Sequence, residues 1–127
     1  MIFRAAAARS AYAANATAEA STYAGIVRLV RSFGAKRVEA AAEETEVPMM
    51  QIPGDQAALT TILVRAIGAR RALEVGTFLG YGAIAIARGL PEDGRLISCE
   101  LDPDYAAKAQ EHLEAAGLAD RVEIRIG

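Results

Sequence analysis

The sequence predicts an α/β fold, one half of a doubly wound parallel sheet preceded by helices. Short apolar runs bounded by glycine and proline alternate with longer segments of helical periodicity, in the order helix, strand, helix, strand, helix, strand. The apolar runs could also be buried helix segments, but their short length and the glycine and proline around them favour strands. The segments between them are long enough to cross over a sheet and return. The strands are therefore expected to pair in parallel.

Length and composition are those of one domain. The chain has 127 residues, of which 53% are hydrophobic, and this is enough for one core. We divide it into residues 1–45, an Ala-rich segment that is helical or poorly ordered, and residues 46–127, which carry the sheet. Before Glu19 the only charges are Arg4 and Arg9, a composition shared with organelle transit peptides, but a frayed helix or an over-extended start is the preferred interpretation.

The net charge and the cysteine content limit the kinds of partner that the protein is expected to have. The formal net charge is -2, whereas a nucleic-acid surface needs a basic patch. No apolar run approaches the roughly 18 residues of a membrane span, because Arg28, Arg31 and Lys36 interrupt the best early candidate. Cys99 is the single cysteine, and no Cys and His cluster has metal-ligand spacing. We expect a cytoplasmic protein with a small-molecule partner, and neither a nucleic acid nor a membrane.

The helix before the first strand follows the loop "VPMMQIPGDQ", whose prolines and glycine favour extended backbone. Asp55 can cap this helix, and Gly68 can end it. Apolar residues recur between these two positions at helical spacing and predict one buried face: Ala58, Leu59, Ile62, Leu63, Ala66 and Ile67.

Two strands and a helix surround a glycine-rich turn. Residues 72–75 form the first apolar run, and the helix after the turn includes residues 83–87 and stops before Pro91. Residues 96–99 form the second apolar run. This is the order of a parallel strand, a crossover helix and a second strand.

A third strand closes the chain. Asp102 with Pro103 behind it is an N-cap followed by proline at the first helical position, and Gly117 ends the helix that starts there. Residues 121–126 alternate charged and apolar side chains, which predicts a strand with one solvent-exposed face.

The glycine turn is expected to bind a ligand, because ligands of open parallel sheets bind at the carboxyl ends of the strands. Gly76, Gly80 and Gly82 remove side chains there, and the turn and helix amides can donate to an anion. Glu100 ends the second strand, where a carboxylate can accept both hydroxyls of a ribose. The spacing G-x-x-x-G-x-G departs from the dinucleotide pattern, and Glu74 would repel a pyrophosphate but favour an ammonium. The ligand expected is a nucleoside that bears an amino acid.

These residues resemble a family. "LEVGTFLGYG" with "CELDP" is similar to motif I and the acidic end of the second strand in class I S-adenosylmethionine-dependent methyltransferases, specifically the O-methyltransferases related to catechol and caffeoyl-CoA enzymes. The resemblance covers residues 49–127. It implies a Rossmann-like fold, with residues 46–127 as a partial S-adenosylmethionine-binding domain, and methyl transfer to a small-molecule hydroxyl.

The resemblance implies cofactor contacts on both sides of the turn. Gly76 and Thr77 would lie along the methionine moiety, with Glu74 near its ammonium. Ile52, in the loop before the helix, would lie over the cofactor from the other side.

Further contacts are implied at the start of the next helix and the end of the second strand. Tyr81 and Gly82 would lie beside the cofactor carboxylate, and Glu100 would take the ribose hydroxyls. The family often has serine where Gly82 stands, so this chain lacks one hydroxyl donor there. Its loss is expected to weaken binding modestly, by about 0.5–1.5 kcal/mol.

The resemblance also implies features that this sequence does not contain. Metal-dependent family members hold a divalent ion through Asp and Asn residues beyond the third strand, whereas this chain ends at Gly127. We therefore expect a fragment without metal ligands, and we assign no catalytic residue. The first strand would be central in the complete sheet, so its uncovered edge predicts self-association or a homodimer. The alternatives are a non-catalytic nucleoside-binding or interaction module and a nucleotide-dependent oxidoreductase.

Overall fold

The computed structural model describes residues 35–127. Of the Ala-rich segment, residues 1–34 lie outside the described residues, and the rest begins with a helix. The elements in chain order are α2 (Ala35–Glu43), η1 (Pro48–Met50), α3 (Gly54–Ala66), β1 (Arg71–Val75), α4 (Tyr81–Gly89), β2 (Arg95–Glu100), α5 (Pro103–Ala115), η2 (Ala119–Arg121) and β3 (Val122–Ile126).

The three strands form one parallel sheet in the order β1-β2-β3. Each crossover carries one helix, α4 between β1 and β2 and α5 between β2 and β3. The register places Glu74 beside Ser98, and Ser98 beside Ile124. This arrangement confirms the α/β prediction: it is a Rossmann-like half sheet preceded by helices.

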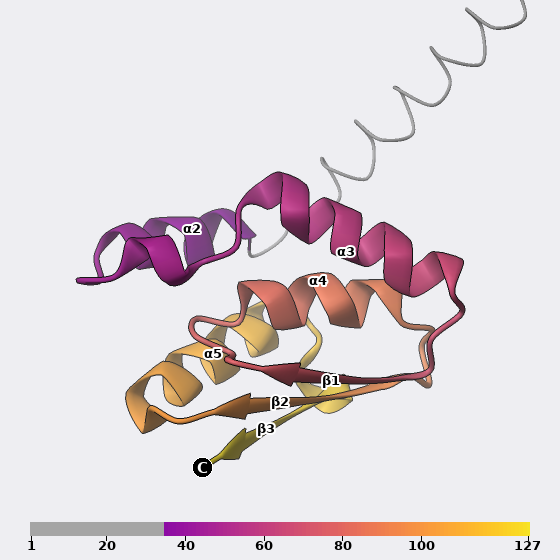
Figure 1. Cartoon of the computed structure of the whole chain (residues 1–127). Helices are drawn as coiled ribbons and strands as arrows, with labels where there is room; N and C mark the ends of the chain where they lie inside the picture. Colours follow the sequence, from indigo (N-terminus) through magenta and orange to yellow (C-terminus); the bar gives the residue numbers. More distant parts are fainter. Residues whose placement is uncertain (1–34) are drawn as a thin grey trace, which may run out of the picture.

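The helices build two layers over one face of the sheet. Helices α4 and α5 pack against the strands, and α3 lies over α4 on the side away from the sheet (Figure 1). The contact between α3 and α4 is close because small groups meet there. Thr61 donates a hydrogen bond to the Ala85 carbonyl at 2.8 Å, and a Cβ on Gly89 would lie 2.7 Å from the Cβ of Val64.

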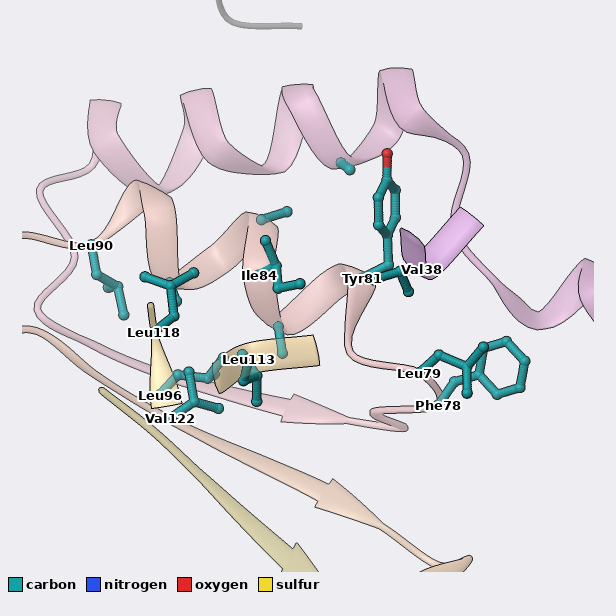
Figure 2. Close-up of a cluster of buried hydrophobic side chains, with 14 of the residues drawn as sticks. Val38, Phe78, Leu79, Tyr81, Ile84, Leu90, Leu96, Leu113, Leu118 and Val122 are labelled. Atoms are coloured by element: carbon teal, nitrogen blue, oxygen red, sulfur yellow. The ribbon is translucent and has the colours of Figure 1, made fainter. Parts of the chain in front are cut away.

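The hydrophobic core lies between the sheet and these helices. Ile84 of α4, Leu96 of β2 and Leu113 of α5 are fully buried in it (Figure 2). Val38 and Ala42 of α2 belong to the same cluster of buried side chains. The division at residue 45 stays a prediction, with α2 before it contributing to the core that the sheet builds.

The opposite face of the sheet has no covering element among residues 35–127. Leu73 and Val75 of β1 are 67% and 83% exposed there, while Ile97 and Cys99 of β2 are half-buried. Within the described chain β1 also pairs with β2 alone, so it is an edge strand. An apolar strand face and an unpaired edge thus lie together.

Local signals set most of the helix ends. Gly68 and Gly117 follow α3 and α5 with φ values of 64° and 68°, the left-handed conformation that closes a helix. In both cases the next residue donates to a carbonyl in the last turn, Ala69 to Val64 and Leu118 to Leu113. Asp102 caps α5 as expected, because its side chain accepts from the N–H groups of Asp104 and Tyr105.

Two expectations for α3 were wrong. The helix begins at Gly54 after Pro53, so Asp55 is in the first turn and is not the N-cap residue; its carboxylate accepts from the Gln56 N–H. The buried face also differs from the predicted one: its buried residues are Ala57, Ala58 and Thr61. Three of the larger predicted core residues are exposed instead: Leu59, Leu63 and Ile67.

None of the helices in residues 35–127 has the length and apolar character that crossing a bilayer requires.

Candidate functional site

The turn between β1 and α4 has left-handed backbone at three positions. Gly76 and Gly80 have φ values of 89° and 88°, and Phe78, with φ 49°, is the non-glycine residue among them. This conformation is strained for an aromatic residue, and such strain concentrates at functional sites. Phe78 is held there because its N–H donates to Glu100 at 2.6 Å and its ring packs edge-on against Tyr105.

The two outer glycines serve different purposes. A Cβ on Gly76 would meet nothing within 4 Å, so the backbone there faces open space that a ligand can approach. A Cβ on Gly80 would lie 3.3 Å from the Cβ of Ala109, so this glycine allows the turn to pack against α5. The first glycine keeps the site open, and the second anchors the turn.

A hollow opens above the turn, between it and the loop that precedes α3. It brings together six of the seven residues predicted as cofactor contacts, with three others between them. Its lining residues are Met50, Gln51, Ile52, Glu74, Gly76, Thr77, Phe78, Tyr81 and Gly82.

Glu74 is the charged group of this hollow, and it is largely buried. Burial, helped by the charge of Glu100, raises the pKa of Glu74 from 4.5 to about 7, although a hydrogen bond from Ser98 acts in the opposite direction. The Ser98 hydroxyl donates to Glu74 Oε2 at 2.6 Å and lies 2.5 Å from the hydroxyl of Thr77. The Thr77 hydroxyl also lies within hydrogen-bonding distance of the Cys99 carbonyl, at 3.2 Å.

Glu100 is the predicted site residue that the hollow does not include. Its carboxylate is buried and accepts from three backbone N–H groups: Phe78 at 2.6 Å, Leu101 at 2.9 Å and Asp102 at 3.1 Å. It therefore ties the end of β2 to the glycine turn. Its expected contact with a ribose stays a prediction.

Tyr81 and Gly82 open α4 at the rim of the hollow. The Tyr81 ring is buried and points away from the sheet toward α3 (Figure 2), and its hydroxyl donates to Glu39 of α2 at 2.9 Å. A Cβ on Gly82 would overlap Glu74 Oε1 as the side chain now lies. The glycine at this position thus leaves room for the Glu74 carboxylate against the start of the helix.

Sequence reasoning missed two polar residues of this region. Gln51 lines the hollow, and its Oε1 is buried without a hydrogen-bond partner, which is a cost that a donor on a ligand would remove. Ser98 is fully buried beneath the hollow. The alternation along β2 carried a signal for Ser98, because residues two apart on a strand share a face and Glu100 was already in view. No comparable signal singled out Gln51.

In the described part of the chain, no three His, Cys, Asp or Glu residues come close enough together to hold a metal ion.

The fold and the site together define a Rossmann-like domain of the methyltransferase type. The chain belongs to the O-methyltransferase family, because the family model described as O-methyltransferase matches residues 27–127. A catechol O-methyltransferase from Niastella koreensis is 40% identical over 84 residues, which are 66% of this chain and 38% of that protein.

Solved structures agree with this assignment. The O-methyltransferase TomG from Streptomyces achromogenes, involved in tomaymycin synthesis and solved in complex with SAM, superposes with a TM-score of 0.71 at 38% identity, over 74% of this chain and 42% of that one. An O-methyltransferase from Bacillus cereus in complex with SAH gives a TM-score of 0.70 at 35% identity, over 74% of this chain and 43% of that one. The chain spans about two fifths of the length of the curated relatives that it matches first, 38% and 40%.

Proposed function

We propose that this chain supplies the S-adenosylmethionine-binding part of an O-methyltransferase that methylates a hydroxyl group of a small molecule. The observation that carries the proposal is the hollow above the glycine turn. It combines a half-buried carboxylate, Glu74, an unpartnered carbonyl oxygen on Gln51, and open backbone at Gly76. The SAM and SAH complexes of the two bacterial relatives support the choice of ligand.

The groups of the hollow match the charges of the cofactor's amino-acid end. Glu74 in its ionised form and the Oε1 of Gln51 are acceptors for an ammonium. Helix α4 starts at Tyr81 without a side-chain cap, so its first N–H groups can receive a carboxylate. Ile52 and Met50 add apolar surface to the same hollow.

When bound, S-adenosylmethionine supplies an activated methyl group on a sulfonium. The described residues contribute binding and orientation, since positioning of the reactants accounts for much of the rate of such transfers. Thr77 and Gly76 line the hollow, and Glu100 holds the turn that carries them. Ordered contacts of this kind keep the cofactor in one pose for an acceptor that approaches from outside.

Finer parts of the proposal concern the whole protein. We infer that a divalent metal, where the reaction uses one, is held by residues other than 35–127, because this part of the chain does not offer a ligand cluster. No step proposed for these residues depends on it. The single cysteine and the mildly acidic composition support a cytoplasmic location.

We further infer self-association through the uncovered edge and face of β1, where Leu73 and Val75 are exposed. Light scattering of the purified chain is expected to give a mass above that of the monomer, and Leu73→Lys is expected to reduce it. A stable, folded monomer of the wild-type chain would contradict the inference.

Calorimetric titration with S-adenosylhomocysteine tests the proposed ligand. The wild-type chain is expected to bind, and Glu74→Gln is expected to bind about 10- to 100-fold more weakly above pH 7, because a hydrogen bond to a charged group is worth about 1.5–3 kcal/mol. Glu92→Gln, which changes an exposed carboxylate outside the hollow, is the matched control and is expected to bind like the wild type.

Two competing ligands separate the alternatives. Adenosine that binds as tightly as S-adenosylhomocysteine would favour a nucleoside-binding module, since the amino-acid end would then contribute nothing. A nicotinamide dinucleotide that binds more tightly would favour an oxidoreductase. A folded wild-type chain that binds none of the three would refute the proposal.

A further inference from the structure

Three hydroxyl and carboxyl groups form a continuous hydrogen-bonded chain beneath the hollow. It runs from Glu74 on β1 to Ser98 on β2, from there to Thr77 in the glycine turn, and ends at the Cys99 carbonyl. Ser98 is completely buried, so no solvent reaches its hydroxyl. The chain joins the charged group of the site to the backbone of the turn.

The number of hydrogens in this chain depends on whether Glu74 is ionised. With Glu74 ionised, Ser98 and Thr77 have one hydrogen each, and the bonds run from Thr77 to Ser98 and from Ser98 to Glu74. The Cys99 carbonyl then lacks the Thr77 donor but still accepts from the Gly76 N–H at 2.9 Å. Every hydrogen of the chain is used.

With Glu74 protonated, the hydrogen-bonded chain has three hydrogens, so the direction of its hydrogen bonds can reverse. Glu74 then donates to Ser98, Ser98 donates to Thr77, and Thr77 donates to the Cys99 carbonyl. The same three side chains at the same distances thus satisfy all donors in both states. A buried donor without an acceptor would otherwise destabilise one of the two states.

We propose that Ser98 and Thr77 are positioning residues that hold the Glu74 carboxylate in the cofactor hollow in both of its protonation states, by reversing the direction of this hydrogen-bonded chain. This inference about Ser98 and Thr77 rests on the proposed function only for the identity of the ligand. Neither residue needs to touch the ligand to act in this way.

Other groups that face Glu74 are few. Glu100 on β2 adds a negative charge. Helix α4 contributes the backbone at Gly82. It also contributes Tyr81, but the phenol of this residue points away from Glu74 and donates to Glu39. The loop before α3 contributes the neutral side chain of Gln51. No cation among the residues that line the hollow offsets Glu74, so the hydrogen-bonded chain is its main support within the described structure.

The proposal predicts effects of opposite sign for the two positioning residues. Ser98→Ala removes the donor to the ionised carboxylate, which favours the protonated form of Glu74. In Thr77→Val the protonated state falls from three hydrogen bonds to one, because Ser98 and Glu74 then have two hydrogens but a single bond between them. The ionised state falls from two hydrogen bonds to one, and its single remaining hydrogen is still used. Thr77→Val therefore favours the ionised form, and Thr77→Ser, which keeps the hydroxyl, changes neither.

The first measurement is the titration of Glu74 in the full chain without ligand. The carbon-13 shift of its side-chain carboxyl is followed by NMR from pH 5 to pH 9, with Glu74→Gln to assign the signal. The wild-type midpoint is expected at about 7. Ser98→Ala is expected to move it up by about one on the pH scale, and Thr77→Val to move it down, since a hydrogen bond to a charged group is worth at least a tenfold change in equilibrium.

The second measurement is the affinity for S-adenosylhomocysteine at pH 7 and pH 9. Ser98→Ala is expected to bind about fivefold more weakly than the wild type at pH 7 and nearly equally at pH 9, where Glu74 is ionised in both. The ratio of the two affinities cancels the titration of the ligand's own amine. A merely structural role for Ser98 would weaken binding by the same factor at both pH values.

The outcomes separate this proposal from the proposed function. Midpoints that move in opposite directions support the hydrogen-bonded chain even if no variant binds S-adenosylhomocysteine, in which case only the proposed function fails. Midpoints that stay at the wild-type value, or that move in the same direction in both variants, overturn it. Should Ser98→Ala fail to fold, the contrast between Thr77→Val and Thr77→Ser carries the same test.

Discussion

Replacing Glu74 by glutamine is expected to stabilise the fold above pH 7, although the residue lies in the proposed binding site. Burial raises the pKa of this carboxyl from 4.5 to about 7. A carboxyl with a raised pKa in the folded state contributes stability below its unfolded pKa of 4.5, and this contribution is lost as the pH rises through 7. Glutamine resembles the protonated carboxyl at every pH, so the variant does not lose this contribution to stability as the pH rises.

The magnitude follows from the two pKa values. Between pH 5 and pH 8 the linkage relation gives a loss of about 2–3 kcal/mol for the wild-type chain. This is a large fraction of the 5–15 kcal/mol that is typical of a whole domain. The neighbouring Ser98 keeps a hydrogen-bond partner in the variant, because the glutamine amide can both donate and accept.

Urea denaturation at the two pH values measures the effect. The free energy of unfolding of Glu74→Gln minus that of the wild type is expected to increase by about 2–3 kcal/mol from pH 5 to pH 8. Carboxylates that do not interact with Glu74 titrate in both proteins and cancel in the difference. Glu92→Gln, at an exposed carboxylate, is the control and should show no such increase. A difference for Glu74→Gln that stays constant between the two pH values would refute the reasoning.

Three further perturbations test the packing around the site by urea denaturation. Leu96→Ala is expected to cost about 2–5 kcal/mol because this side chain is fully buried, whereas Leu73→Ala on the uncovered face is expected to cost less than 1 kcal/mol, and equal costs would contradict the layer arrangement. Gly89→Ala is expected to destabilise by about 1–3 kcal/mol, since its Cβ would lie 2.7 Å from the Cβ of Val64, and a stabilising effect would show that α3 and α4 can separate freely. Asp102→Ala is expected to cost about 1 kcal/mol through the lost cap of α5, and a neutral result would show that the two backbone N–H groups find water equally well.

The sequence predicted those parts of the fold that depend on neighbouring residues. Gly68, Gly117 and Asp102 end or begin helices through hydrogen bonds that span a single turn, so their residue types are sufficient signals. The glycine turn was predictable for the same reason. Its left-handed conformations at Gly76 and Gly80 are local requirements that few other residues meet.

The orientation of α3 was not predictable from its own periodicity. Leu59, Leu63 and Ile67 form the most apolar stripe, yet the face that packs on α4 is the one with Thr61 and small residues. The reason lies in the partner helix, because Gly89 leaves room for Val64 and for the backbone of Thr61 to approach α4 closely. A hydrophobic pattern identifies apolar residues, but the distance between two helices decides which of them are buried.

The site shows the same division between local and distant causes. Glu74 and Gly82 were identified from the sequence because they flank a recognisable glycine turn. The close approach of the Glu74 carboxylate to Gly82 was not predicted, because it depends on a side chain that folds back onto the next helix. In the structure, glycine at position 82 matters because it leaves room, and not because a hydroxyl is missing. A Cβ there would overlap the Glu74 carboxylate in the position where this carboxylate is hydrogen-bonded to Ser98. The departure from the family's serine and the buried hydroxyl chain are therefore parts of one arrangement. Gly82→Ser would therefore require the end of the flexible Glu74 side chain to shift from its present position.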